Sequence, residues 1–403
     1  MFHTQPEETS AMSKCTIPSF VGQVIFCGFD VHKDKWSVCV RHCGREIAAY
    51  PAPADARAIA GKLRRDYPDA DIRSVYEAGF SGFEAHRILV EEYGIRNIVI
   101  NPADVPTNNK ERTRKSDRID CRKLARTLEA GLLEPIYVPS RDHLQFRNLV
   151  RRHTRTTSSL TRTINQLKSH WYFNGEPVPT RVCRRVLASR REQALRNGDY
   201  TSVSLIDQYF FLIELRKTIR TWEHETILQL NLSAKMKNLV SIPGIGFRTA
   251  TVILSEIWDV RRFPDKDHLA SYAGFAPYLV GSGEKEETVG ADCRKHKLLH
   301  YILIQAAWRA ARSDPEMICL YGKLQKRRHS PQRIACIIAK KLLFIARAVL
   351  LEDREYRSAG AGKKKDPLRT GSGAAASCPP PSPTGQGGVP FPPSAEPSIS
   401  RGD

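Results

Sequence analysis

The sequence predicts an α/β domain, then two mostly helical regions, then a tail without regular structure. Short apolar runs alternate with helical patterns over 21–140, as in a sheet crossed by helices. Apolar residues recur every three or four positions over 141–235 and 236–355, which indicates helices. The tail, 356–403, holds nine prolines and eight glycines from residue 358 onwards, so we expect it to be disordered.

Each element of the first region follows from its own pattern. Strands are expected where apolar or alternating runs stand between polar segments, at 24–30, 36–40, 47–50, 72–79 and 97–101. Helices are expected at 54–67, 82–94 and 117–131. The last of these opens with acidic residues, which suits the positive end of a helix dipole. The order predicts a mixed sheet.

The middle region, 141–235, is predicted to contain a long helix that pairs with another helix. Residues spaced alternately by four and three form almost four heptads: Phe146, Val150, His153, Thr157, Leu160, Ile164, Leu167 and Trp171. The seam fits a coiled coil with a second subunit as well as it fits packing within one chain. A second helical stretch follows a break at 174–180 and runs from Leu205 to Trp222.

The charge distribution predicts a polyanionic partner. The 403 residues hold 63 Lys and Arg against 43 Asp and Glu, a net charge of +20. Residues 110–196 alone hold 21 basic and 8 acidic residues, which favours a nucleic-acid surface over a solvated helix face. No uninterrupted apolar run reaches about 18 residues, so we expect no membrane partner. The ten cysteines show no CxxC pair and residues 1–15 show no apolar signal segment, which favours a protein of the reducing cytoplasm.

Four acidic residues stand where a metal site could form. Asp30 and Glu77 each end a predicted strand, and Asp117 and Asp120 lie three apart at a helix start. Carboxylates at a sheet edge suit two Mg²⁺ ions, which sit roughly 3.5–4 Å apart in enzymes that displace phosphodiesters. Helix and turn capping by the same aspartates explains the pattern equally well.

Two glycine-containing motifs stand in the third region. Residues 241–257 read apolar-Pro-Gly-apolar-Gly before a helix, so Gly244 and Gly246 predict a helix-hairpin-helix that binds phosphate through backbone N–H groups. A tight turn between packed helices is the alternative. Within an insert at 276–296 that we expect to be irregular, Ser282 stands between Gly281 and Gly283. By itself that triplet predicts a flexible turn, and no His–Asp relay is evident nearby.

Three segments resemble a known family: GFDVHKDKWSV, YEAGFSG and NNKERTRKSDRIDCRKLAR. They are similar to the amino-terminal domain of DEDD transposases of the insertion-sequence one-ten family, which is RuvC-like and RNase H-like. The resemblance implies that Asp30, Glu77, Asp117 and Asp120 bind the metal. Residues 236–312 resemble the carboxy-terminal domain of the same family, which implies that Ser282 is the nucleophile.

The resemblance also implies partners and mechanism. Family members form a phosphoserine link to DNA, choose donor and target with a structured noncoding bridge RNA, and assemble as dimers or tetramers with active sites shared between subunits. Two positions depart from the family pattern: Lys295-His296 replaces Gly-Asn, and His300 replaces Arg. The residues expected to contact nucleic acid are Arg114, Lys115, Arg118, Arg151, Arg152, Arg155, Gly244, Gly246 and Arg248.

The resemblance therefore implies an RNA-guided transposase-recombinase that binds DNA, needs Mg²⁺ and exchanges strands through Ser282. It also implies a prokaryotic protein that is associated with the nucleoid in the cytoplasm. A structure-specific, metal-dependent hydrolytic nuclease, similar to a junction resolvase, would share the acids but use water as the nucleophile. A catalytically inactive DNA-binding protein is the other alternative. The sequence does not give the target site, the RNA or the oligomer number.

Overall fold

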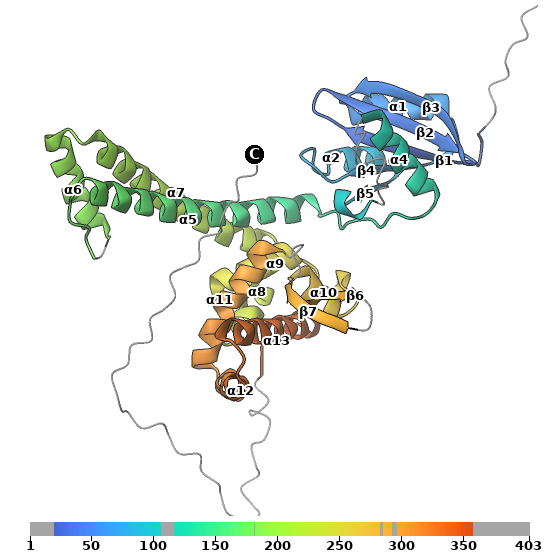
Figure 1. Cartoon of the computed structure of the whole chain (residues 1–403). Helices are drawn as coiled ribbons and strands as arrows, with labels where there is room; N and C mark the ends of the chain where they lie inside the picture. The colour runs from blue at the N-terminus through green and yellow to red at the C-terminus, as the bar shows by residue number, and fades with distance from the viewer. Residues whose placement is uncertain (1–19, 106–116, 181, 283–284, 292–295, 358–403) are drawn as a thin grey trace, which may run out of the picture.

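The computed structural model describes residues 20–105, 117–180, 182–282, 285–291 and 296–357 (Figure 1). Residues 358–403 of the predicted disordered tail, together with Arg114 and Lys115, lie outside the described residues. An α/β unit stands at one end of a long helical pair, and a mostly helical unit packs beside that pair. In the described part of the chain, no helix is both long and apolar enough to cross a membrane.

The amino-terminal unit is built on a five-stranded mixed sheet, as predicted. Its strands are β1 (Val24–Val31), β2 (Lys35–His42), β3 (Arg45–Pro53), β4 (Asp71–Glu77) and β5 (Arg96–Ile100). Their order in the sheet is β3-β2-β1-β4-β5. The first three strands pair antiparallel, whereas β4 is parallel to β1 and β5 is parallel to β4. The central strands read as apolar runs because both of their faces are covered.

Helices cover both faces of this sheet. On one face lie α1 (Ala56–Asp66), α2 (Glu84–Arg87) and the π-helix η1 (Ile88–Glu92), which share a core with Ile25, Cys27 and Phe29 of β1. On the other lies α4 (Asp117–Glu129), and a short 3-10 turn, η2 (Pro102–Asp104), follows β5. The helix expected over 82–94 is therefore a short α-helix that widens into a π-helix.

The middle of the chain forms an antiparallel helical pair. The pair consists of α5 (Arg141–Phe173) and α7 (Tyr200–Gln229), and α6 (Arg184–Asn197) lies between them in the chain, at the end far from the sheet (Figure 1). Because α5 packs along α7, the heptad seam finds its partner within the same chain.

The observed seam on α5 differs slightly from the predicted one. Thr157 is exposed and Ile164 is only half-buried, whereas Thr156 and Thr163 are buried. A straight α-helix has 3.6 residues per turn, so a strict heptad drifts around it and neighbouring positions turn inward.

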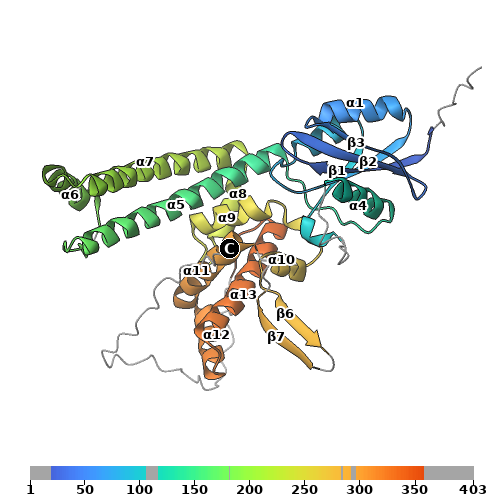
Figure 2. The same ribbon diagram turned by 45° about the horizontal axis from the view of Figure 1, so that its top comes forward.

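The carboxy-terminal unit is a helical bundle with one hairpin of strands. Its helices are α8 (Ser233–Val240), α9 (Phe247–Ile257), η3 (Val260–Arg262), α10 (Lys266–Tyr272), α11 (Lys297–Ser313), α12 (Pro315–Lys326) and α13 (Pro331–Glu352). Between α10 and α11, β6 (Pro277–Ser282) pairs antiparallel with β7 (Lys285–Ala291) and projects from the bundle (Figure 2). The expectation of an irregular insert at 276–296 is thus wrong, because β6 and β7 form a regular pair in which the backbone N–H and C=O groups of the two strands bond to each other.

Candidate active site

Asp30 and Glu77 lie at the carboxyl ends of neighbouring parallel strands, since Asp30 is the last residue but one of β1 and Glu77 is the last residue of β4. The register of β1 and β4 pairs Phe29 with Tyr76, so the next residues along the two strands are Asp30 and Glu77. Carboxyl ends of parallel strands meet at one edge of a sheet, which is where the sequence placed these two acids. The side chain of Asp30 is 18% exposed, and Glu77 is also partly buried.

Both acids face the helix α4. Gly28 pairs with Val75, and every second residue of a strand shares a face, so Asp30 and Glu77 lie on the face of Gly28 and Val75. Val75 packs in one cluster with Leu124 of α4, which identifies this face as the one that α4 covers. The two carboxylates therefore share one face and one edge of the sheet.

Gly28 brings the start of α4 close to this edge. A Cβ at Gly28 would stand 2.2 Å from the Cys121 carbonyl oxygen and 2.5 Å from the Ala125 nitrogen, so only glycine allows this approach. Burial, and next the negative charge of Asp30, raise the pKa of the Cys121 thiol to about 11. Asp30 thus lies near the first turns of α4, where Asp120 directly precedes Cys121.

The donor set fits a hard divalent cation, because all four predicted ligands offer carboxylate oxygens. Among the described residues, no group of three or more His, Cys, Asp or Glu side chains is arranged to hold a metal. Asp117 is the first residue of α4, but its side chain lies outside the described part. The site of four ligands therefore stays a prediction. The described structure places Asp30 and Glu77 at one edge of the sheet and brings α4 close to that edge.

His32 is a neighbour of this edge that the sequence reasoning missed. Its Nε2 atom lies 3.1 Å from Oδ2 of Asp30. The two residues stand two apart where β1 ends, in the segment DVHKD, and that spacing could have drawn attention to the histidine. Its ring can compete with a metal ion for the Asp30 oxygen.

Ser282 is the last residue of β6 and pairs with Lys285 of β7. Its backbone therefore sits at the end of a hairpin arm, whereas its side chain and the next residue lie outside the described part. The neighbouring helices hold the two ends of the hairpin. Before β6, the ring of His300 stacks on Phe275 with centroids 4.6 Å apart, and its Nδ1 donates to the carbonyl of Ala273 at 3.1 Å.

After β7, His296 fixes the chain at the start of α11. Its Nδ1 accepts from the backbone N–H of Leu299 at 3.2 Å, so Nε2 carries the proton. Nε2 then donates to Oε2 of Glu256, 3.1 Å away. The two departures from the family pattern, His296 and His300, thus both anchor the hairpin to the bundle.

Glu256 is the buried acceptor in this anchor. Arg151 of α5 donates to both carboxylate oxygens at 2.8 Å. Burial alone would raise the pKa of Glu256, but hydrogen bonds from His296 and Arg151 outweigh burial and lower it to about 2. The positive charge of Arg151 on α5 therefore contacts, through Glu256, the residue His296 that follows the Ser282 hairpin.

The predicted nucleic-acid contacts fall into distinct environments. Arg152 and Arg155 are exposed on α5, and the side chain of Arg118 lies outside the described part. Arg151 is bound to Glu256. Arg248 donates to Oε1 of Glu223, which is buried, at 2.7 Å. Phosphate contacts by Arg151 and Arg248 stay predictions, but both side chains are already engaged within the chain.

The glycine turn joins α8 to α9. Gly244 has a φ of +88°, and a Cβ there would stand 2.7–2.8 Å from Ala306 and Ala310 of α11. Its main visible role is to let two elements pack, which is the alternative that the sequence left open. Gly246 is the N-cap of α9 and has no atom within 4 Å of a built Cβ, so that helix end is open.

A mixed sheet with acidic strand ends, joined to a mostly helical remainder, has the organisation of a DEDD-type transposase. Two family models match the chain: one described as "Transposase", of the DEDD IS110 type, at residues 27–171, and one described as "Transposase IS116/IS110/IS902 family" at 236–322. The chain belongs to the IS110 family of insertion-sequence transposases, enzymes that transfer DNA strands. A DEDD-type domain suggests dependence on a divalent metal.

Individual relatives agree with this assignment. The putative transposase y4qE of Sinorhizobium fredii is 26% identical over 70% of this chain and 71% of its own length. The putative transposase y4rJ of the same organism is 27% identical over 72% of this chain and 81% of its own. The transposase for insertion sequence element IS1111A of Coxiella burnetii is 23% identical over 66% of this chain and 74% of its own.

Proposed function

We propose that this transposase cleaves and exchanges DNA strands through a covalent link between Ser282 and a DNA phosphate, assisted by carboxylates at Asp30, Glu77, Asp117 and Asp120. The observation that carries the proposal is the position of Asp30 and Glu77, each directly after the Phe29–Tyr76 pair of β1 and β4, on the face that α4 covers. Two acids lie at the same end of adjacent strands, and Gly28 lets α4 approach closely beside them. This concentration of negative charge requires a physical explanation. A bound cation supplies one.

The four acids would hold two Mg²⁺ ions. Mg²⁺ prefers carboxylate oxygens and water, which fits this donor set. When bound, it stabilises charge on the oxygens of a phosphate under attack. The protein's own contribution is to fix the acids on rigid strands, and His32 competes for Asp30 in the absence of a metal.

At the second part of the site, the Ser282 oxygen bonds to phosphorus as the bond to the leaving deoxyribose oxygen breaks. The hydroxyl proton is lost to a base, and the leaving oxygen takes up a proton. The free deoxyribose hydroxyl of a second cleaved strand then attacks the same phosphorus and loses its proton, the bond to the Ser282 oxygen breaks, and that oxygen takes up a proton, so the strands are joined and Ser282 is released. Precise placement matters for such a displacement. His296 and His300 support it by fixing both ends of the β6–β7 hairpin.

The same proposal assigns the parts of the chain. Residues 21–140 form an RNase H-like, RuvC-like domain, 141–235 a basic helical linker, and 236–355 a transposase domain with the helix-hairpin-helix. A structured noncoding RNA guides the choice of DNA. Subunits pair as dimers or tetramers, which is supported by apolar surface left on α7, where Phe211 is 65% and Trp222 48% exposed.

A strand-exchange assay tests this function. It combines the purified full-length chain with duplexes carrying the element's flanking DNA and RNA transcribed from its noncoding ends. Ser282→Ala is expected to abolish joined products. A hydrolytic nuclease would share the Asp30–Glu77 edge, so metal-dependent nicking that survives in Ser282→Ala would favour the nuclease instead.

A further inference from the structure

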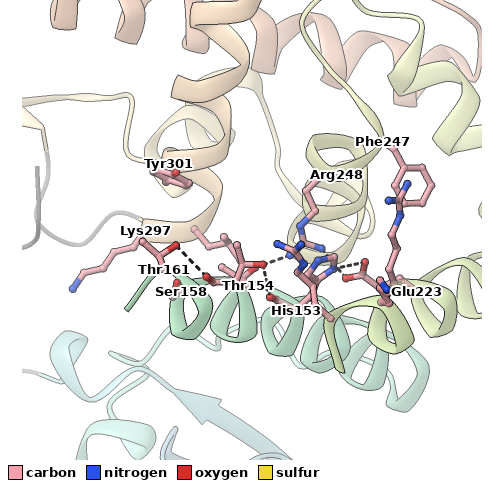
Figure 3. Close-up of a pocket in the computed structure, with 14 residues that line it drawn as sticks. His153, Thr154, Ser158, Thr161, Glu223, Phe247, Arg248, Lys297 and Tyr301 are labelled. Carbon is pink, nitrogen blue, oxygen red and sulfur yellow. Dashed lines mark hydrogen bonds and ion pairs between the residues drawn. The ribbon is translucent and has the colours of Figure 1, made fainter. Parts of the chain in front are cut away.

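A large cleft lies between the helical pair and the carboxy-terminal bundle. It has a volume of about 1100 Å³ and is walled by α5, α7, the start of α9 and the start of α11 (Figure 3). This volume is at the upper end of the roughly 300–1,000 Å³ that is typical of ligand pockets. Among the predicted metal ligands whose side chains are described, Asp30, Glu77 and Asp120, none lines it.

One wall is a row of hydroxyl groups on α5. Thr154, Thr157, Ser158 and Thr161 line the cleft at the spacing of one helix face. The threonine hydroxyls donate back to carbonyls of their own helix, for example Thr157 to His153 at 3.0 Å, so their oxygens can still accept. Hydroxyl groups of this kind contact phosphate and sugar oxygens in nucleic-acid complexes.

The facing walls are cationic. Arg216 and Arg220 of α7 and Lys297 of α11 line the cleft, and none of the three has a hydrogen bond or ion pair to another described residue. The one acidic lining residue, Glu223, is fully buried and is bound by Arg248 and by Nδ1 of His153 at 2.7 Å. The cleft therefore keeps a positive charge that the described protein does not neutralise.

Two helix starts add to this charge. Phe247 is the first residue of α9 and Lys297 the first of α11, and both line the cleft. The start of α9 has no side-chain cap, so its backbone N–H groups are available to an anion. Helix starts that bind phosphate do so through these groups.

Aromatic rings complete the lining. Tyr301 is 59% exposed, and Phe247 stacks on His224 with centroids 4.3 Å apart. An exposed ring beside unpaired cations is the combination that holds single strands, because each base has a face that can stack. An acidic peptide would use the cations but gains little from the rings.

We propose that this cleft binds the sugar–phosphate backbone of one nucleic-acid strand, with Arg216, Arg220 and Lys297 on its phosphates and Tyr301 against an unpaired base. The proposal rests on the proposed function only in taking nucleic acid as the ligand. It adds a binding site between α5, α7 and α11 that is distinct from the carboxylate edge and from the serine hairpin.

The test measures binding of short fluorescent single strands, DNA and RNA of the same sequence, to the full-length chain over a salt series. The cleft variant is Arg216→Ala/Arg220→Ala/Lys297→Ala. The matched control is Lys323→Ala/Lys326→Ala/Arg327→Ala, which removes the same charge at the end of α12, away from α5 and α7 in both views. Thermal unfolding and circular dichroism confirm that both variants are folded.

We expect the cleft variant to bind at least one of the two strands roughly tenfold more weakly at low salt, and the control to bind as wild type. The slope of log affinity against log salt should fall by about 2, since each phosphate contact on a single strand contributes about 0.7. Whichever strand responds, DNA or RNA, is the ligand. Equal weakening by both variants would overturn the proposal, because it would show attraction by overall charge.

Two further arms test the kind of ligand. Tyr301→Ala should weaken binding of the responding strand roughly tenfold while Tyr301→Phe does not, because a ring is enough to stack. If the cleft variant weakened binding of a polyglutamate peptide as much as that of the strand, the site would be a general anion site and the proposal would fail. Because binding is measured without strand exchange, a failure of the Ser282 mechanism leaves these results unaffected.

Discussion

Arg151 on α5 and Glu256 on α9 form a two-point ion pair, with both nitrogen–oxygen distances at 2.8 Å. Glu256 is fully buried, whereas the arginine side chain is 36% exposed. The pair joins the helical pair to the carboxy-terminal bundle, and through His296 it reaches the base of the serine hairpin. A residue predicted to hold DNA thus has a clear role inside the protein.

Arg151→Ala should lower the free energy of unfolding by about 3 kcal/mol, because it leaves a buried carboxylate with His296 as its remaining partner. Arg155→Ala is the matched control, since Arg155 lies four residues on along α5 and is exposed. It should change stability by about 0.5 kcal/mol or less. Urea unfolding followed by circular dichroism measures both, and equal effects would show that the ion pair does not stabilise the fold.

Divalent ions should stabilise the protein through Asp30 and Glu77. Mg²⁺ or Mn²⁺ well above its dissociation constant should add about 1–3 kcal/mol, seen as a rise in Tm that EDTA reverses. The rise should be absent in Asp30→Asn/Glu77→Gln. Asp69→Asn, just before the opposite end of β4, removes one exposed negative charge away from this edge and should keep the rise. A rise that persists in the double variant would place the metal elsewhere.

Gly28→Ala should push α4 away from the sheet. The added Cβ would meet backbone atoms of Cys121 and Ala125 that cannot rotate aside, so we expect a loss of about 3 kcal/mol. The metal-dependent rise in Tm should also shrink, because Asp120 moves with the helix. Gly61→Ala in α1 is the control: its added Cβ would stand 4.0 Å from the ring of Tyr93, and alanine there should stabilise by about 0.5–1 kcal/mol. Similar behaviour of the two variants would contradict the close approach.

Acid should weaken the junction between α5 and α9 through His143. Burial, partly offset by the hydrogen bond to Ser255, lowers the pKa of His143 from 6.5 to about 4. The unfolded chain therefore binds more protons between these pH values, and stability should fall as pH drops from 6.5 towards 4, by up to about 3 kcal/mol. Unfolding at a series of pH values measures this loss.

His143→Gln should flatten that decline, because glutamine can donate to Ser255 without titrating. Glu256 provides an internal check, since its pKa of about 2 lies below the ordinary 4.5. Its contribution is present above pH 4.5 and is lost only as pH falls from there towards 2. A steep decline between pH 6.5 and 4 in the glutamine variant would exclude His143 as its source.

The strands could be predicted because each one carries its own local signal. β1 and β4 are apolar runs with an acid next to the end of β1, Asp30, and at the end of β4, Glu77, so both the strands and these acids are visible in the sequence. The π-helix and the β6–β7 hairpin were missed because neither has a periodic apolar pattern long enough to identify it. The seam on α5 predicted a helix partner, but sequence spacing cannot say whether that partner is in the same chain.

The candidate site was harder to predict, because it depends on contacts between distant segments. Nothing near Arg151 or Arg248 in the sequence reveals that each meets a buried glutamate about 105 or 25 residues away. The motif predicted that Gly244 contacts a phosphate. In the structure, its positive φ and its close approach to Ala310 allow the turn to pack against α11. Arg216, Arg220 and Lys297 look like ordinary surface charges until α7 and α11 are placed around one cleft.

The most direct measurement of the central claim is a search for a protein–DNA adduct that survives denaturation. The full-length chain, Ser282→Ala and Asp30→Asn are each incubated with the element's flanking DNA, its noncoding RNA and Mg²⁺, and then resolved on a denaturing gel. We predict an adduct with wild type that is absent from Ser282→Ala and much reduced in Asp30→Asn or with EDTA. Metal-dependent nicking without an adduct, unchanged in Ser282→Ala, would contradict the serine mechanism.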